Sequence, residues 1–343
     1  MPRSRDPFAG LVPPRARAEL LGTGVTVAQL RTRKWQCTSR GFYLPADVSL
    51  SDPFQRILNA SVRTPPAGAI GGWAAARVHG AEPFDGLASD GSTELDIPVT
   101  CGEDEIRAVP GIEVWADPLP AEEVIHVGGV RITGRARTCF DGMRRAANLV
   151  EAVVFADLML HAELVTLSDM RRYVDRHPRW RGVPQARRAL DLADPSARNA
   201  WETRLRMVWL LDAGLPRPLC NPPVFDLRGN LLGFPDLLDP ESATISEFDG
   251  AGHRRLRQHA GDNVREELFE DHNFEVTRAV SLDFADTPEL ARRMRRARVR
   301  GLHRDRRRDR WTLEPPPDWG ATGAQDEVNA LLEAMDAAWV PPF

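Results

Sequence analysis

The sequence predicts a multidomain protein of mixed α/β class. Its 343 residues exceed what one hydrophobic core usually organises, so about two domains are the first expectation. Hydrophobic residues make up 42% of the chain, which is enough to build buried cores. Segments with helical and with strand periodicity alternate, and proline-rich joints separate them. The joints divide the chain into four segments, which are residues 1–66, 67–194, 195–284 and 285–343.

The composition narrows the class of protein. No apolar run reaches the roughly 18 to 20 residues that a membrane span needs, and the first residues do not resemble a signal peptide, so we expect a cytoplasmic protein. The four cysteines form no CxxC pair, which argues against a zinc knuckle or a disulfide framework and predicts small buried side chains. The net charge is −4, and Lys34 is the single lysine. The places where arginines gather are therefore more informative than the total charge.

The first segment predicts two short helices followed by a β-hairpin. The helices are expected at residues 15–21 and 26–34, with Thr26 as the N-cap of the second. Strands are expected at 35–38 and 41–44, around a turn at 39–41. This order is typical of a winged helix-turn-helix, although a helical lid with a surface hairpin has the same order. In a winged helix, the basic residues that would contact duplex DNA are Arg31, Arg33, Lys34 and Arg40.

The second segment predicts a mixed α/β module without a recognisable site. Helices are expected at 70–79, 150–161 and 168–175, with a further helix that Thr138 caps and that runs to 145, and strands at 94–100, 112–115 and 124–133. Gly71 and Gly72 lack the surrounding glycine pattern of a phosphate-binding loop. The histidines of this segment have no metal-ligand spacing, so we expect them to be structural or exposed.

The third segment predicts the element order α, β, β, β, α, β. Its first helix is expected at 196–212 and ends at Gly214, with Glu202 and Arg206 one turn apart on a flank. Three strands follow at 223–227, 231–238 and 244–249. A helix at 262–271 and a strand at 274–280 complete the segment.

Three carboxylates are predicted to converge on two of these strands. Glu247 and Asp249 are two residues apart and therefore share a face, and a short turn places Asp236 on the antiparallel neighbour, opposite Glu247. Carboxylates at such short range repel each other unless a hard cation such as Mg²⁺ or Mn²⁺ neutralises them. A site of this kind suits phosphodiester hydrolysis. The alternative is structural, because Asp249–Gly250 is also a common turn and Asp236 could cap the turn before Pro240.

An ordered set of motifs in the third segment resembles a nuclease family. NAWETRLR, GLPRP, GFPDLLDP, EFDGAGH and DNVREEL are similar to the very-short-patch-repair-like branch of the PD-(D/E)XK nucleases, over residues 195–284. The resemblance implies a restriction-endonuclease-like core and metal-dependent DNA cleavage. Asp249 stands at the position of the motif lysine, so activation of water would depend on the metal. The site residues that it implies are the metal ligands Asp236 and Glu247, Asp249 as a third ligand or water-positioning group, Glu202 for a metal-bound water or a second cation, His253 as an aid to water activation, and Arg265 for a phosphate or a carboxylate.

The earlier segments show a second resemblance. LRTRKWQCTSRGFYLP, GGWAAARVHG and GVRITGRARTCFDGM are similar to the N-terminal and central parts of AbiEi-type antitoxins and their actinobacterial relatives. The resemblance implies DNA contact at the front of the chain, and it admits a cognate toxin as a partner. It also leaves open two rival functions: a non-catalytic DNA-binding regulator with a degenerate nuclease domain, and a module that acts through protein contacts with a toxin.

Residues 289–310 contain eleven arginines and three acidic residues. Such density predicts a local positive field, and we expect contact with DNA phosphates from the helical half of the stretch, through Arg292, Arg293, Arg295 and Arg296. The alternative is a solvated helix whose arginines pair with acidic residues elsewhere on the surface. The remaining tail is proline-rich and then acidic, and its one amphipathic helix could screen the arginines.

Overall fold

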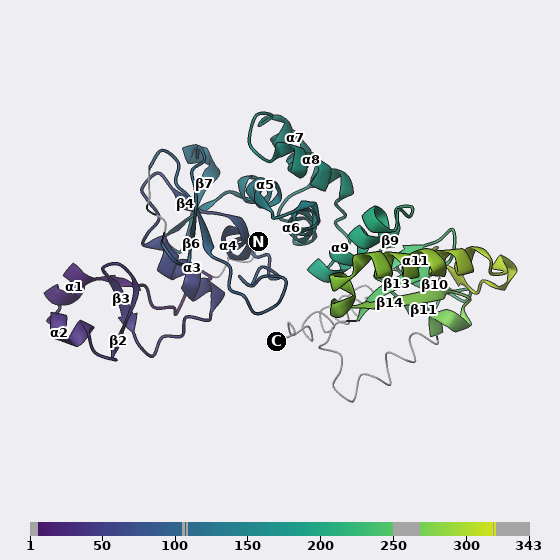
Figure 1. Ribbon diagram of the computed structural model, residues 1–343, viewed down its shortest axis with the longest axis horizontal. Helices are drawn as coiled ribbons and strands as arrows, with labels where there is room; N and C mark the ends of the chain where they lie inside the picture. The colour runs from purple at the N-terminus through teal and green to yellow at the C-terminus, as the bar shows by residue number, and fades with distance from the viewer. Residues whose placement is uncertain (1–5, 105–106, 108, 250–267, 318, 320–343) are drawn as a thin grey trace. The chain divides into compact units, whose positions relative to one another are not determined.

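A computed structural model of the protein describes residues 6–104, 107, 109–249, 268–317 and 319 (Figure 1). The chain divides into two compact units, Met1–Leu192 and Ala193–Phe343. Helices and four sheets, each of three to five strands, make up the described residues, so the predicted mixed α/β class is confirmed. None of the described helices is both long and apolar enough to span a membrane.

The first unit begins with a small three-stranded sheet in the order β1-β3-β2. β1 (Arg15–Ala16) leads into α1 (Arg17–Gly22), and β2 (Trp35–Ser39) and β3 (Phe42–Pro45) form the predicted hairpin. The predicted helix at 26–34 is wrong in length, because α2 covers only Val27–Leu30. A capping box of Thr26 and Gln29 fixes its start, and the helix ends within one turn at Arg31. Cys37, on β2, is exposed and not buried as expected.

A five-stranded mixed sheet in the order β6-β5-β4-β8-β7 forms the centre of the first unit. Its strands are β4 (Ala69–Ile70), β5 (Ile97–Thr100), β6 (Ile112–Trp115), β7 (Val124–Val127) and β8 (Val130–Thr133). The single strand predicted at 124–133 is wrong, because β7 and β8 pair as an antiparallel hairpin. Gly128 and Gly129 make the turn with φ of +54° and +82°, values that glycine adopts without strain.

Helices make up most of the remainder of this part of the first unit. They are α3 (Pro53–Ser61), α4 (Gly72–His79), α5 (Arg135–Arg145), α6 (Leu149–His161), α7 (Leu167–Asp175) and α8 (Val183–Leu192), with the short η1 (Ala121–Glu123). α3 and α8 were not expected. Thr138 does not cap a helix, because α5 begins directly after Gly134 and Thr138 lies within it. The Thr138 hydroxyl forms hydrogen bonds with Thr133 inside the core.

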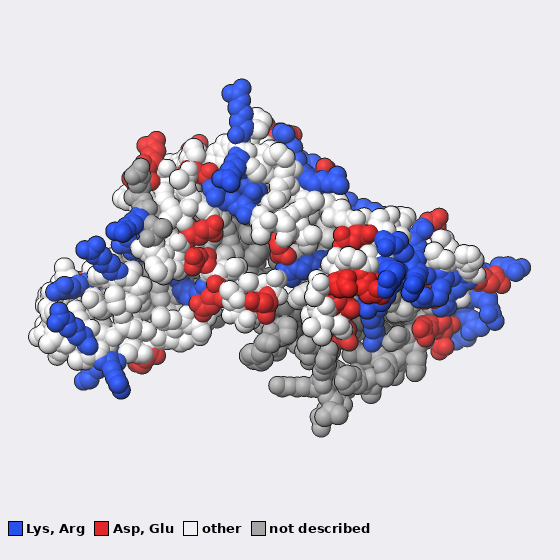
Figure 2. Space-filling model, in the orientation of Figure 1, with Lys and Arg blue, Asp and Glu red and all other residues white. Residues whose placement is uncertain are grey.

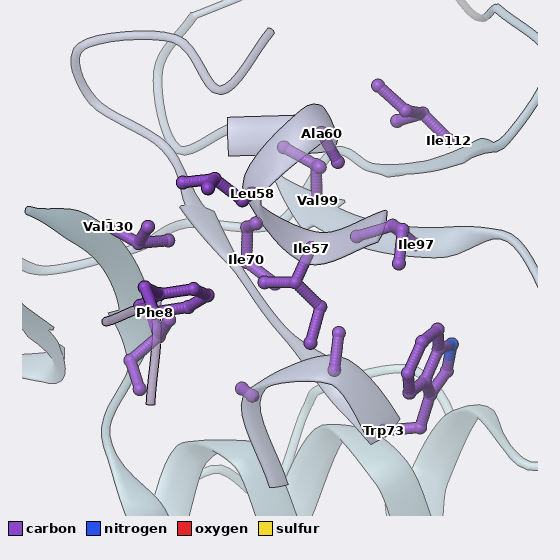
Figure 3. Packing of buried hydrophobic residues seen from close by; sticks show 13 residues of the cluster. Phe8, Ile57, Leu58, Ala60, Ile70, Trp73, Ile97, Val99, Ile112 and Val130 are labelled. Carbon is purple, nitrogen blue, oxygen red and sulfur yellow. The ribbon is translucent and has the colours of Figure 1, made fainter. Parts of the chain in front are cut away.

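The core of the first unit draws residues from both sides of position 66. Phe8 from the start of the chain and Ile57 from α3 pack with Ile70 and Trp73, as Figure 3 shows. Val99 from the central sheet lies in the same cluster. The segment that precedes the central sheet is therefore tied to it by burial of apolar surface.

The second unit begins with α9 (Ala200–Met207), which continues as one π-helical turn, η2 (Val208–Asp212). The helix starts four residues later than predicted, because the Asn199 side chain accepts hydrogen bonds from the N–H groups of Trp201 and Glu202 and so acts as the N-cap. Gly214, with φ of +64°, follows the helix as expected.

Two sheets follow in the second unit. One has the order β14-β13-β12-β9 and consists of β9 (Leu219–Cys220), β12 (Leu237–Asp239), β13 (Thr244–Asp249) and β14 (Glu275–Val280). The other has the order β11-β10-β15 and consists of β10 (Val224–Asp226), β11 (Leu231–Gly233) and β15 (Trp311–Thr312). The strand predicted at 231–238 is wrong, because its halves belong to different sheets. Pro235 lies between the halves and has no N–H for a ladder.

Both faces of the four-stranded sheet are covered. On one face, Leu290 and Met294 of α11 (Thr287–Leu302) pack with Leu237 and Ala279, and Figure 1 shows α11 lying across β13 and β14. On the other face, Leu238 and Ile245 pack with residues of the second sheet. η4 (Ser281–Ala285) leads into α11, and η5 (Arg306–Arg308) follows it. Of the helix predicted at 262–271, only residues 268–271 are described, and they are helical.

Candidate functional site

The pairing of β12 with β13 brings two of the predicted site residues together. The strands are antiparallel, and Leu237 lies opposite Ser246, so the next pair along the same register is Asp236 and Glu247. The Asp236 carboxylate also accepts a hydrogen bond of 2.7 Å from the Phe248 N–H. This bond fixes the Asp236 side chain against β13, beside the position of Glu247.

Glu247 and Asp249 lie on one face of β13, and both are partly exposed. β13 pairs in parallel with β14, where Arg278 is the register partner of Glu247. The end of the sheet thus presents carboxylates of two strands, with an arginine at the register position of a third. His253 and Arg265, the other residues expected here, lie outside the described residues.

The donor chemistry of this end of the sheet suits a hard divalent cation. Carboxylate oxygens are preferred ligands of Mg²⁺ and Mn²⁺. Within the described part of the chain, no three His, Cys, Asp or Glu side chains are grouped closely enough to hold a metal ion by themselves. Mg²⁺ commonly binds through only one or two carboxylates, with water and substrate phosphate as its other ligands, so Asp236 and Glu247 fit it as a partial set.

Glu202, which the sequence places on a flank of the first helix of this unit, is buried. Only 6% of the residue is exposed. Its carboxylate accepts hydrogen bonds from the Arg198 N–H at 2.8 Å, from Asn199 Nδ2 at 2.6 Å and from Asn221 Nδ2 at 2.7 Å. Arg206, one turn later, is fully buried as well. The described contacts give Glu202 a structural role, in which it completes the cap of α9.

Asn221 was not predicted, and it links Glu202 to the candidate site. Its side chain donates to Glu202 and to the Ser196 carbonyl, while its backbone N–H donates to the Asp236 carbonyl at 3.2 Å. Its φ is +48°, a left-handed conformation that asparagine tolerates better than most residues. The start of α9 and the residue that precedes β12 are therefore joined through one buried asparagine.

The basic residues predicted at the front of the chain are exposed. Arg31, Arg33 and Lys34 follow α2, and Arg40 lies in the turn of the β2–β3 hairpin. None of the four forms an ion pair with a residue that the structure describes. Their charges consequently face solvent beside a short capped helix and a hairpin.

The arginines of α11 are mostly engaged with neighbouring carboxylates. Arg293 forms two hydrogen bonds with Asp283, of 2.8 and 2.9 Å, and also donates to the Arg278 carbonyl. Partial burial opposes ionisation of Asp283, but the hydrogen bonds from Arg293 and from the Val280 N–H outweigh it and lower the Asp283 pKa. Arg292 pairs with Glu289, and Arg295 donates to the Asp212 carbonyl. Arg296 is exposed and has no ion pair among the described residues.

The later arginines of the same stretch are paired too. Arg298 bonds to Asp239 at 2.8 Å and to Glu241, and Arg300 and Arg304 both bond to Glu275. Figure 2 shows the resulting alternation of blue and red side chains over α11. Much of the positive charge that the sequence concentrates here is therefore neutralised locally, as the alternative interpretation expects.

Comparisons of the chain with protein-family models, with curated proteins and with solved structures find no match. The function proposed below therefore follows from the residues of this chain, their motifs and their geometry.

Proposed function

We propose that the second unit is a metal-dependent DNA endonuclease of the very-short-patch-repair-like PD-(D/E)XK type. The observation that carries the proposal is the β12–β13 register, together with the hydrogen bond from the Phe248 N–H to Asp236. These contacts hold Asp236 next to Glu247 at the end of the sheet. Carboxylates at adjacent register positions suit a hard cation, and the five motifs that resemble the nuclease family lie in this unit.

In this proposal, Asp236 and Glu247 hold Mg²⁺ or Mn²⁺. A bound divalent cation polarises the scissile phosphate, lowers the pKa of water and stabilises charge on the leaving oxygen. Asp249, on the same face of β13 as Glu247, is a third ligand or accepts a hydrogen bond from the attacking water. Glu202 accepts a hydrogen bond from Asn221 at the start of α9, and in this proposal it orients a metal-bound water or a second cation.

We propose that the N-terminal segment is a winged helix that contacts duplex DNA. Two short helices precede a hairpin whose turn bears Arg40, and three further basic residues follow α2. Exposed basic side chains without carboxylate partners retain their charge for phosphates. Replacement of Arg31, Arg33, Lys34 and Arg40 by alanine in the full chain should weaken DNA binding and reduce its salt dependence, and unchanged affinity at low salt would remove this contact.

One specific observation favours a second candidate function. The described carboxylates Glu202 and Asp236 both make structural hydrogen bonds, and Asp249 replaces the motif lysine. In that alternative, the chain is a non-catalytic DNA-binding regulator of the AbiEi-antitoxin type, with or without a toxin partner, and the nuclease-like unit serves as a binding platform.

DNA cleavage distinguishes the two candidates. Purified full-length protein is incubated with single-stranded, nicked, mismatched and duplex DNA in Mg²⁺ and separately in Mn²⁺. The nuclease proposal predicts cleavage that Glu247→Gln abolishes while DNA affinity is kept or increased, because loss of a carboxylate reduces repulsion of phosphate. Glu241→Gln is the matched control, since this exposed carboxylate lies at the turn between the same two strands. Persistent cleavage by Glu247→Gln would contradict the site, and no cleavage of any DNA by the wild type would favour the regulator.

A further inference from the structure

A second arginine-rich region lies in the first unit, on the helical hairpin of α7 and α8. Residues 167–192 contain seven arginines, three aspartates and no lysine or glutamate. All seven arginines are exposed, and Figure 2 shows blue side chains standing out over α7 and α8 at the top of the view. We call this set the hairpin arginines; it consists of Arg171, Arg172, Arg176, Arg179, Arg181, Arg187 and Arg188.

The hairpin arginines differ from those of α11 in how few carboxylates they meet. Arg172 pairs with Asp169, and Arg187 lies 3.6 Å from Asp175. The others, including Arg179 and Arg181 in the connection between the helices, form no ion pair with a described residue. Arginines are less dense in residues 167–192 than in residues 289–310. A larger fraction of them, however, has no carboxylate partner among the described residues.

A buried ionic network fixes the connection that carries Arg179 and Arg181. Asp141 of α5 is fully buried and accepts hydrogen bonds of 2.7 Å from Arg137 and from Arg144. Both guanidinium groups lie against the Trp180 ring, at 4.6 and 5.1 Å from its centroid. The two guanidinium groups thus fix the position of the Trp180 ring.

Backbone contacts fix the same connection at its next residues. Arg144 donates a hydrogen bond of 3.3 Å to the Arg181 carbonyl. Gly182 has φ of +84°, and a Cβ at this position would lie 2.2 Å from the Arg144 carbonyl oxygen. No other residue fits so close to α5 without displacing the backbone. Arg179 and Arg181 therefore project from a fixed backbone. This reduces the entropic cost of ordering them when a ligand binds.

We propose that the hairpin arginines of the first unit bind the sugar–phosphate backbone of duplex DNA. Arginine binds phosphate through two parallel N–H donors, and it keeps its charge at all physiological pH values. The Trp180 ring is engaged by Arg137 and Arg144, so this ring serves the fold and not the stacking of an unpaired base. A contact made only by charge and hydrogen bonding to phosphates is independent of base sequence.

This surface lies in a different unit from the candidate catalytic carboxylates and does not depend on cleavage. Its test is therefore made in EDTA, where no divalent cation is available. The variant Arg179→Ala/Arg181→Ala removes two hairpin arginines without an ion-pair partner. The control Arg172→Ala/Arg187→Ala removes the same charge from the same hairpin at positions that have carboxylate neighbours. Calorimetry on all proteins verifies that they fold alike.

The measurement is the affinity of the full-length protein for a labelled duplex of arbitrary sequence over a series of NaCl concentrations. Each phosphate contact contributes about 0.9 to the slope of log affinity against log salt, so Arg179→Ala/Arg181→Ala should reduce the slope by about 2. The control should change the slope by less than half as much. Equal slopes for Arg179→Ala/Arg181→Ala and wild type would overturn the proposal. Loss of binding to polyglutamate without loss of DNA affinity would overturn it too, by assigning the surface to an acidic protein.

Discussion

Asn221→Ala should destabilise the second unit far more than a surface asparagine does. The Asn221 side chain is buried, with 9% of the residue exposed, and its Nδ2 donates to Glu202 and to the Ser196 carbonyl. A hydrogen bond to a charged group contributes about 1.5–3 kcal/mol and a neutral one about 0.5–1.5 kcal/mol. Alanine at φ of +48° adds strain of about 1–2 kcal/mol. The expected loss in the free energy of unfolding is therefore about 3–6 kcal/mol.

The matched control is Asn230→Ala. Asn230 is exposed, and its Nδ2 also donates to a carboxylate, that of Asp226, at the same 2.7 Å. Because solvent competes for an exposed bond, this change should cost less than about 1 kcal/mol. Asn221→Gly removes the side chain but tolerates the positive φ, so its cost should be lower than that of Asn221→Ala by about the strain, or about 1 kcal/mol.

Scanning calorimetry of the full chain measures these differences. For a unit of this size, each 1 kcal/mol shifts the melting temperature by about 2–4 °C, so Asn221→Ala should lower the transition of the second unit by about 6 °C or more. Hydrogen exchange should accelerate in α9 and β12, the elements that Asn221 joins. Equal shifts for Asn221→Ala and Asn230→Ala would show that burial does not strengthen the hydrogen bonds of Asn221.

Two further predictions concern the first unit. Asp141→Asn breaks a buried ionic network and leaves Arg137 and Arg144 without their shared counterion, so unfolding in urea should show a loss of about 3–5 kcal/mol. Arg137 also pairs with Glu123, and Arg144 with Asp117. A loss below about 1 kcal/mol would show that these two outer carboxylates suffice for the arginines. Burial lowers the pKa of His79, with Arg135 acting in the same direction against the hydrogen bond to Thr133, so the folded state holds this imidazole neutral. The unfolded state binds the proton more readily, and stability should therefore decrease as pH falls below the ordinary value of about 6.5. His79→Gln should flatten the decrease in melting temperature between pH 7.5 and pH 5, and an unchanged slope would exclude His79 as its source.

Elements with strong local signals were predictable from the sequence. The strands at 112–115 and 244–249 match β6 and β13, since apolar residues and turn residues bound them clearly. Two predictions were wrong because one continuous strand was expected across residues that interrupt a strand. Gly128 and Gly129 divide the strand predicted at 124–133 into β7 and β8. Pro235 interrupts the strand predicted at 231–238, and its two halves lie in different sheets.

The candidate site was predictable only where its residues are close in sequence. The short turn between β12 and β13 places Asp236 near Glu247 in any antiparallel arrangement. The role of Glu202 depends on Asn221, which sits beside the two-residue strand β9 and leaves no periodic signal. The partners of the α11 arginines are likewise distant, because Arg298 meets Asp239 and Arg300 meets Glu275 only after folding.

The nuclease proposal requires that Asp236 and Glu247 bind a divalent cation, and calorimetric titration measures this binding. Mn²⁺ is titrated into the full-length wild type and into the variant Asp236→Ala/Glu247→Ala, alone and with a non-cleavable duplex that supplies phosphate ligands. Glu241→Ala, which removes an exposed carboxylate at the neighbouring turn, serves as the control. We expect binding to the wild type and to the control, and loss of binding in the double variant. Equal binding by the wild type and the double variant would contradict this expectation.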